Sequence, residues 1–316
     1  MIKNIVILGD CKWNKNPWAG SIISKIYGLK NVMVAYNVFG DVAEKHNIKL
    51  YKSCFCWYKN KKFTKGWVYE KGKWKCAYDI SPDFIFDKIS SDSDTIKIKK
   101  QFSRQEKILN TWFIEKLCSD KWKTYKLFPH LVPKGYLVNG MAEVKKAIKK
   151  IKSDKVVIKP RYGSSAKGLY IIDKREIVPK VKGEYIVQEF IDSSRGLDGI
   201  CKGICDVRVV MVNSVVNHVF TRIAKCGLIS NDSCGGKIKF LKFDKIPISA
   251  KKIVKLVNSK LKKHQPNVYT ADFIIDKNNR AWLIELESKP GVIDYELYNG
   301  NKQRENFYNS IIQSIK

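Results

Sequence analysis

The sequence has 316 residues, of which 44% are hydrophobic and 28% are charged. This composition provides apolar material for one large domain or two to three smaller ones and excludes a wholly disordered chain. Lysine and arginine number 60 against 30 acidic residues, a formal net charge of +30; because nearly all of the excess is lysine, a nucleic acid is possible as a ligand but is not favoured over anionic small molecules or an acidic protein.

The first part of the chain has short apolar runs separated by helix-length stretches, a pattern that predicts a small α/β domain. The expected strands are residues 5–8, 32–36 and 83–86. Residues 51–78 are rich in Trp, Tyr and Lys and have glycines at turn positions, so we expect a packed β-hairpin; stacking on nucleic-acid bases is the alternative. The polar run at residues 90–94 is the first expected domain boundary.

Longer blocks of helix and strand follow. The expected helices are residues 101–117, 121–128, 141–151, 249–263 and 306–315. The second of them ends at Pro129, because proline does not continue a helix. From residue 155 to residue 243 the apolar period is two, which predicts strands. Two further strands are expected over residues 269–276 and 281–287.

Cysteine usage and the N-terminal segment favour a reducing, cytoplasmic compartment. The nine cysteines form no Cys-x-x-Cys pair and have no histidine at zinc-site spacing, so we expect reduced thiols and no zinc. Residues 1–10 lack the pattern of a signal peptide. No apolar run approaches the roughly 20 residues that span a bilayer.

A loop within residues 156–172 is flanked by two strand-like runs, and Lys159 ends the first of them. Its small residues are Gly163, Ser164, Ser165 and Gly168. Such residues let backbone N–H groups approach phosphate oxygens. The loop is not a Walker A loop, which needs Lys-Ser/Thr at its end, nor a dinucleotide-binding loop, which a helix must follow. Phosphate binding and an ordinary hairpin turn are therefore both open.

Three carboxylates are expected on one face of the C-terminal hairpin. A two-residue turn at Asn278 and Asn279 would place Asp272 opposite Glu285, with Glu287 on the same face two residues later. Such carboxylates repel each other unless a cation or basic side chains lie between them. Oxygen-only ligands suit Mg²⁺ or Mn²⁺; an exposed acidic face paired with lysines is the alternative.

The order of these motifs resembles the ATP-grasp superfamily. The order is Lys121, Lys159-Pro160, the Gly/Ser loop, Gln188-Glu189-Phe190-Ile191, Asp206-x-Arg208, Arg222, Asn231 with Gly235-Gly236, Asp272, and Glu285-x-Glu287-Ser288-Lys289-Pro290-Gly291. The resemblance covers residues 81–295. Within the superfamily the chain is similar to glutamate-adding and other amino-acid or peptide ligases. Residues 81–87 (SPDFIFD) and 119–122 (SDKW) also resemble spore-coat-associated ATP-grasp proteins.

The resemblance implies a three-part α/β (α+β) fold in which two sheet-containing subdomains hold ATP. It divides the chain into an N-terminal α/β domain (residues 1–95), a central lid-bearing subdomain (96–182) and a C-terminal subdomain (183–316). The implied reaction is ATP-dependent ligation: a carboxylate attacks the γ-phosphate to give an acyl phosphate and ADP, and an amine then displaces phosphate to leave an amide or peptide bond. The implied substrates are a carboxylate and an amine, such as an amino acid, a peptide or an acidic protein tail.

The resemblance also implies roles for the nucleotide-binding residues. Lys121 and Lys159 would contact the ATP phosphates, and the loop at residues 163–168 would close over the β- and γ-phosphates. Gln188 and Phe190 would hold adenine through backbone groups. A carboxylate near this hinge would hold the ribose, and Glu189 is among the expected nucleotide-binding residues.

The remaining implied roles concern metal and catalysis. The expected Mg²⁺ or Mn²⁺ ligands are Asp272, Glu285 and Glu287. Arg208 and Arg222, with Asn231, would face the transferring phosphoryl group and the substrate carboxylate. Glu287 stands where the superfamily usually has Asn, and its extra negative charge would tighten cation binding or draw in a lysine such as Lys289.

Two other functions stay open on the sequence alone. One is an ATP-grasp kinase that phosphorylates a hydroxyl of an anionic small molecule. The other is an inactive ATP-grasp scaffold that binds a polyanion. The absence of ATP binding, together with salt-sensitive binding to a polyanion, would be characteristic of it.

Overall fold

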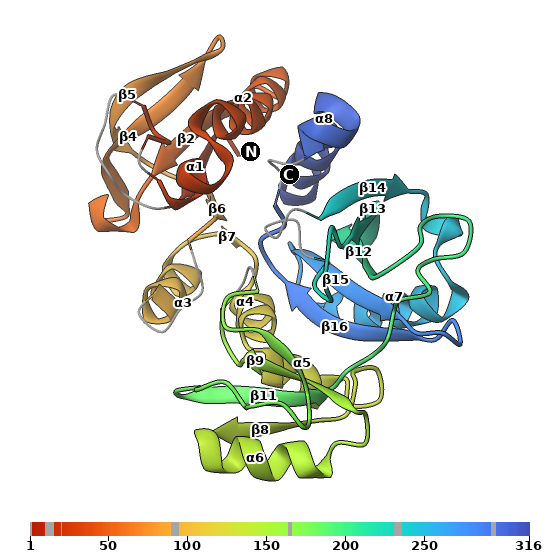
Figure 1. The fold of residues 1–316 in the computed structure, drawn as a ribbon. Coiled ribbons are helices and arrows are strands. Elements are labelled where there is room, and N and C mark those ends of the chain that lie inside the picture. The colour runs from red at the N-terminus through yellow and green to blue at the C-terminus, as the bar shows by residue number, and fades with distance from the viewer. Residues whose placement is uncertain are drawn as a thin grey trace.

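The computed structural model describes residues 2–9, 16–19, 21–89, 95–163, 166–230, 236–291 and 295–316. Within these residues, three β-sheets follow one another, and helices join and cover them (Figure 1). This arrangement confirms the α/β class and the division of the β-structure into an N-terminal sheet and two later sheets.

In the described part of the chain, the N-terminal sheet has seven strands and combines parallel and antiparallel pairing. Its parallel strands are β1 (Asn4–Leu8), β2 (Lys49–Ser53), β6 (Phe84–Asp87) and β7 (Ile108–Leu109). Its antiparallel strands are β3 (Tyr58–Lys59), β4 (Lys62–Glu70) and β5 (Lys73–Ile80). A 3₁₀ turn at Phe55–Trp57 leads into β3. The expected hairpin is therefore present as β4 and β5, and Trp67 is buried in it, as packing rather than base stacking requires.

Helices α1 (Ile22–Tyr27) and α2 (Leu29–Lys45) connect β1 to β2. The strand expected over residues 32–36 is wrong, because these residues lie inside α2. Val32, Ala35 and Phe39 are buried and recur at helical spacing. A five-residue apolar run alone does not distinguish a buried strand from part of a buried helix.

The helix expected over residues 101–117 is also wrong, because it is two helices. α3 (Thr95–Gln105) ends before β7, and α4 (Trp112–Ser119) begins after it. Ile108 pairs with Ile85 of β6. Tertiary pairing in the N-terminal sheet thus takes priority over local helix propensity. The boundary predicted at residues 90–94 lies outside the described residues.

The central sheet has four antiparallel strands in the order β10-β9-β11-β8. They are β8 (Gly135–Asn139), β9 (Lys155–Pro160), β10 (Tyr170–Asp173) and β11 (Glu184–Glu189). α6 (Met141–Lys150) packs on this sheet through Val144 and Ile148. α5 (Lys121–Leu127) precedes it, so both helices expected here are present. Because β11 pairs with β8 and β9, the sheet extends past residue 182, where the sequence placed a boundary.

The C-terminal sheet has five antiparallel strands in the order β14-β13-β12-β15-β16. They are β12 (Cys205–Val212), β13 (Val215–Ile223), β14 (Lys237–Leu241), β15 (Val268–Ile275) and β16 (Ala281–Glu287). After a 3₁₀ turn at Phe243–Lys245, α7 (Ile248–Leu261) covers one face.

The last helix, α8 (Tyr295–Ile315), returns to the N-terminal region and lies beside α2 (Figure 1). The rings of Tyr308 and Phe39 stack with centroids 4.2 Å apart. One apolar cluster contains residues of the N-terminal sheet, of α8 and of the C-terminal sheet, including Val210 and Phe220. These two sheets therefore share a hydrophobic core, whereas the central sheet has its own.

Two further expectations concern compartment. Among the residues that the structure describes, no helix has the length and apolar character that a membrane crossing requires. The expectation of reduced thiols is wrong for Cys54, which is disulfide-bonded. The other six described cysteines are free.

Candidate active site

The C-terminal hairpin places Asp272 opposite Glu285, as predicted. The predicted two-residue turn is wrong, however, because the strands end at Ile275 and Ala281, which pair with each other. A β-bulge at Ile284 then shifts the register by one residue and restores the predicted pairing. The changed loop length and the bulge have opposite effects on the register, so Asp272 and Glu285 still share a face. The sequence pattern predicted neither of these two features.

Basic groups surround these carboxylates. Lys121 Nζ lies 3.1 Å from Glu285 Oε1 and also donates to the carbonyl oxygen of Gly163 at 2.5 Å. The backbone N–H of Lys289 donates to Glu287 Oε1 at 3.0 Å. Burial raises the pKa of Glu287, and the neighbouring charge of Glu285 raises it further. A cation beside this pair would relieve both effects.

Asp272 is held by two arginines. Arg208 donates to both of its carboxylate oxygens, at 2.8 and 2.6 Å, and Arg222 donates to Oδ2 at 2.8 Å. Arg222 also makes a bidentate contact with Asp206, at 2.9 and 2.7 Å, and Ser230 donates to the same carboxylate. Burial alone would raise the pKa of Asp272, but the two guanidinium groups hold it below its usual range. Charge-assisted hydrogen bonds therefore hold the two arginines in place on the two aspartates in the free protein.

Lys159 reaches from the central sheet to the C-terminal sheet. Its ammonium donates to the carbonyl oxygen of Ile284, the bulge residue, at 3.2 Å. Burial lowers the pKa of this ammonium to about 8; Glu285 opposes the shift and Lys121 adds to it. Lys121 and Lys159 thus both lie beside the carboxylate hairpin.

We expect Lys159→Ala to weaken ADP binding at least tenfold at neutral pH, because a charge-assisted phosphate contact contributes about 1.4 kcal/mol or more. Isothermal titration calorimetry measures the change. Lys75→Ala, which removes an exposed lysine paired with Glu70, is the matched control. Equal ADP affinity in Lys159→Ala and the parent would exclude this lysine from the nucleotide site.

The lowered pKa of Lys159 also gives ADP binding a pH dependence. Below about pH 8 the free protein already carries the charged ammonium. Above that pH the lysine is neutral in the free protein, so binding phosphate must take up a proton and the affinity falls. We expect proton uptake on ADP binding at about pH 9, measured by calorimetry in buffers of different ionisation enthalpy, and none in Lys159→Arg, which stays charged.

The glycines of the predicted phosphate loop adopt the backbone conformations that the prediction needs. Gly163 has φ of 106° and Gly168 has φ of 71°, both in the region that favours glycine. A Cβ at Gly168 would lie 3.0 Å from the Pro160 ring, so this position also requires a close approach. Ser164 and Ser165 lie outside the described residues, and so does Asn231. Their predicted roles stay predictions.

The segment expected to bind adenine runs along β11. The side chain of Gln188 is buried and donates to the carbonyl oxygen of Pro133 at 2.9 Å. The backbone N–H of Glu189 donates to the carbonyl oxygen of Lys134. The N–H of Phe190 contacts the Ser153 hydroxyl at 3.3 Å. Adenine would have to displace this hydroxyl, and the adenine role stays a prediction.

The carboxylate donors fit a hard divalent cation in part. Among the described residues, no group of three or more His, Cys, Asp or Glu side chains is arranged to hold a metal ion. Glu285 and Glu287 lie on one strand face, where their carboxylate oxygens would serve as ligands for such a cation. Asp272 would join them only by releasing a guanidinium group. We therefore retain Glu285 and Glu287 as the residues that would hold Mg²⁺, with Asp272 as the anchor of the arginines.

We expect Glu285→Gln to abolish the extra thermal stability that Mg²⁺ adds to the ADP complex, because binding to the folded state is what raises Tm. The measurement is Tm with ADP alone and with ADP plus Mg²⁺. Glu70→Gln, at the exposed Lys75–Glu70 pair, should keep the Mg²⁺ increment. An unchanged increment in Glu285→Gln would mean that this carboxylate serves only to pair with Lys121.

Sequence reasoning missed several residues that order the site. Asp120 accepts two N–H bonds from Arg161, at 2.8 and 2.6 Å, and also caps the helix that begins with Lys121. An aspartate directly before a helix is a signal for the cap, but nothing local predicts its pairing with Arg161. Asp206 was likewise without a predicted role.

Comparison with known proteins identifies the family of this chain. A family model for the RimK-like ATP-grasp domain matches residues 118–311. The chain belongs to this family. A search of curated proteins gives no match. Membership of the RimK-like ATP-grasp family confirms the expected class of enzyme, an ADP-forming ligase that joins a carboxylate to an amine with ATP and Mg²⁺ as cofactors.

Solved structures show the same fold along the whole chain. D-alanyl-alanine synthetase A from Vibrio cholerae has a TM-score of 0.60 and 12% identity, with 100% of this chain and 99% of that chain covered. VanG D-Ala:D-Ser ligase from Enterococcus faecalis has a TM-score of 0.62 and 12% identity, with both chains fully covered. An ATP-grasp ligase associated with RiPPs from Chryseobacterium gregarium, in complex with ADP and a leader and core peptide, has a TM-score of 0.60 and 11% identity, with 99% and 97% covered.

Proposed function

We propose that this ligase activates a carboxylate of an acidic peptide or protein tail and joins it to an amine. The observation that carries the proposal is the convergence of opposite charges on the C-terminal sheet. Two arginines meet on Asp272, and two lysines from elsewhere in the chain meet the hairpin at Glu285 and Ile284. A site of this kind positions and neutralises anions, which is what phosphoryl transfer to a carboxylate requires.

Each group has a role in the proposed reaction. Lys121 and Lys159 hold the ATP phosphates from the side of the central sheet. Arg208 and Arg222 orient the substrate carboxylate, whose oxygen attacks the γ-phosphorus while the bond to the ADP oxygen breaks. The amine then attacks the acyl carbon, phosphate leaves, and the amine loses a proton. Mg²⁺, when bound by Glu285 and Glu287, offsets phosphate charge.

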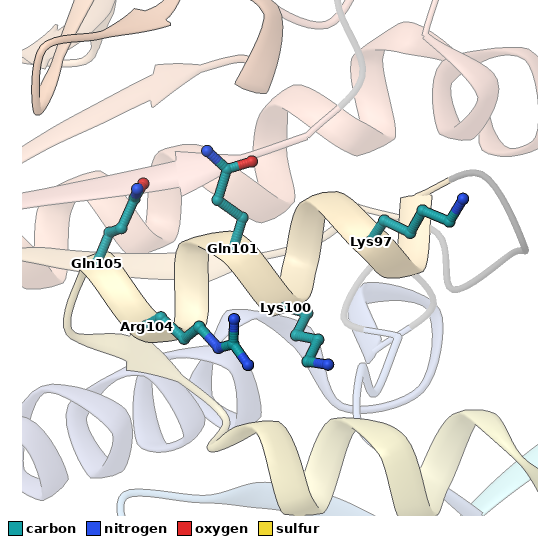
Figure 2. A pocket seen from close by; sticks show the side chains of 5 residues that line it. All are labelled: Lys97, Lys100, Gln101, Arg104 and Gln105. Carbon is teal, nitrogen blue, oxygen red and sulfur yellow. The ribbon is translucent and has the colours of Figure 1, made fainter.

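The outer face of α3 supports an acidic substrate. Its exposed side chains line an open pocket of about 270 Å³ (Figure 2), and they are Lys97, Lys100, Gln101, Arg104 and Gln105. No acidic side chain is among them, and α3 itself contains none. Such a face attracts acidic chains over a distance of about 10 Å at ordinary salt.

We add a cytoplasmic location to the proposal, since the reaction consumes ATP.

Hydroxylamine trapping tests the reaction. An acyl phosphate reacts with hydroxylamine to give a hydroxamate, so ATP, Mg²⁺ and the correct acidic peptide should yield hydroxamate and ADP in equal amounts. The peptides to screen are glutamate- and aspartate-rich tails, with lysine-rich tails of equal length as controls. ADP with a phosphorylated alcohol and no hydroxamate would mean a kinase. ATP binding without any ADP formation across the screen would mean an inactive scaffold.

A further inference from the structure

Four buried side chains form a compact cluster of alternating charge, which we call the ion quartet. Its members are Asp87, Lys99, Glu115 and Lys289, with side chains between 2% and 11% exposed. Glu115 Oε1 lies 2.8 Å from Lys99 Nζ and 2.7 Å from Lys289 Nζ. Asp87 Oδ2 lies 3.2 Å from the first ammonium and 3.5 Å from the second. Within the quartet, two ammonium groups thus face two carboxylates.

The quartet joins parts of the chain that are far apart in sequence. Asp87 ends β6 of the N-terminal sheet, Lys99 lies on α3 and Glu115 lies on α4. Only Lys289 comes from the C-terminal region, two residues after the end of β16. The quartet therefore fixes the exit of β16 against the first third of the chain.

Further bonds hold the same short segment after β16. Ser288 Oγ donates to Glu115 Oε2 at 2.9 Å. Asn110 donates to the carbonyl oxygen of Ser288 at 2.9 Å, and Lys88 donates to the carbonyl oxygen of Pro290 at 3.1 Å. Three consecutive residues, 288–290, are thus each bound by a side chain from residues 88–115. This backbone has little freedom to rotate.

We propose that Lys289 is a positioning residue for Glu287. The ammonium of Lys289 is committed to the quartet, and its backbone N–H donates to Glu287 Oε1 at 3.0 Å. Fixing Lys289 at its side chain therefore fixes the donor that orients the Glu287 carboxylate. The inference rests on the proposed function, in which Glu287 holds the cation.

The separate partners of the Lys289 ammonium and of its backbone N–H support the same assignment. Within the quartet, Asp87 and Glu115 already match the charges of Lys99 and Lys289. The sequence suggested that a lysine could neutralise Glu287; the Lys289 ammonium makes its ion pairs with Asp87 and Glu115, and its positive charge still lowers the pKa of Glu287. The direct contact of Lys289 with the Glu287 carboxylate is made by a peptide N–H, which orients the carboxylate and carries no formal charge.

The test is direct Mn²⁺ binding in the presence of ADP, followed by electron paramagnetic resonance of free Mn²⁺. Lys289→Met should raise the Kd for Mn²⁺ at least tenfold while the Kd for ADP without metal changes less than twofold. Lys289→Arg keeps the charge and should restore Mn²⁺ binding to within about threefold of the parent. Lys75→Met, at the exposed Lys75–Glu70 pair, is the matched control and should change neither constant.

A second variant covers the case in which Lys289→Met does not fold. Ser288→Ala removes one bond to Glu115 and keeps all four charges, and it should raise the Kd for Mn²⁺ about threefold. Unchanged Mn²⁺ affinity in the folded variants, with only lower stability, would overturn the positioning role. Parent protein that binds ADP but no Mn²⁺ would overturn the proposed cation site itself, which separates the two failures.

Discussion

Arg222→Ala should lower the rate of hydroxamate formation at least hundredfold. The guanidinium group lies between Asp206 and Asp272, and in the proposed reaction it faces the negative charge shared by the substrate carboxylate and the incoming phosphoryl group. Removing one such fixed positive partner from a transition state costs about 2.7–4 kcal/mol, or a hundred- to a thousandfold in rate. The rate of hydroxamate formation at saturating ATP measures it.

The control for this prediction must separate chemistry from folding, because Arg222 is buried and its loss leaves two carboxylates without a shared partner. Arg222→Ala combined with Asp206→Asn removes one of these charges and should recover stability but not the rate. Arg222→Lys should stay at least tenfold slow, since an ammonium cannot bridge two carboxylates with a planar fork. If the rate of hydroxamate formation recovered together with stability in the double variant, Arg222 would have only a structural role.

Glu115→Gln should lower the free energy of unfolding by about 3–5 kcal/mol, the cost of removing one partner from a buried ion pair. Glu115 contacts both Lys99 and Lys289, so its loss removes one of the two carboxylates that the quartet offers these ammonium groups. Urea denaturation at constant pH measures the change. Glu70→Gln, at an exposed pair, should change the free energy by less than about 0.5 kcal/mol.

The effect of Glu115→Gln should depend on pH with a definite sign. Burial alone would raise the pKa of Glu115, but Lys289 and Lys99 hold it well below its usual range. A depressed carboxylate pKa gives stability that is present above the unfolded value of about 4.3 and is lost as pH falls toward the folded value. The difference between parent and variant should be constant near neutral pH and shrink below about pH 4. A difference that instead grew on acidification would contradict the ion quartet.

The sequence predicted the carboxylate hairpin because two strand-like runs flank an Asn-rich turn, and both signals lie within one short segment. Asp272 and Glu285 face each other even though the predicted turn length is wrong, since the bulge at Ile284 corrects the register. The strand predicted at residues 32–36 failed for the opposite reason: the local pattern fits two structures, and packing against the N-terminal sheet selects the helix. The single helix predicted over residues 101–117 is wrong at residues 106–111, because the segment's own sequence does not reveal that it pairs with β6.

Motif order predicted which arginines belong to the site, but it did not predict their contacts. Arg208 and Arg222 were named from their order along the chain, but their meeting on Asp272 depends on the pairing of three strands. The sequence singled out Lys289 only as a lysine that Glu287 would draw in. It did not predict the ion quartet, because Asp87 and Lys289 are 202 positions apart. Long-range charge pairing of this kind requires the fold to be known first.

The shared core of the N-terminal and C-terminal sheets has a mechanical consequence. Phe39, Tyr308 and Phe220 belong to one apolar cluster, so these two sheets cannot separate without exposing it to water. The central sheet and α6 have a separate core, and they reach the C-terminal sheet through polar contacts such as that of Lys159. Opening to admit a nucleotide should therefore be a swing of the central sheet about a stationary base formed by the rest of the molecule.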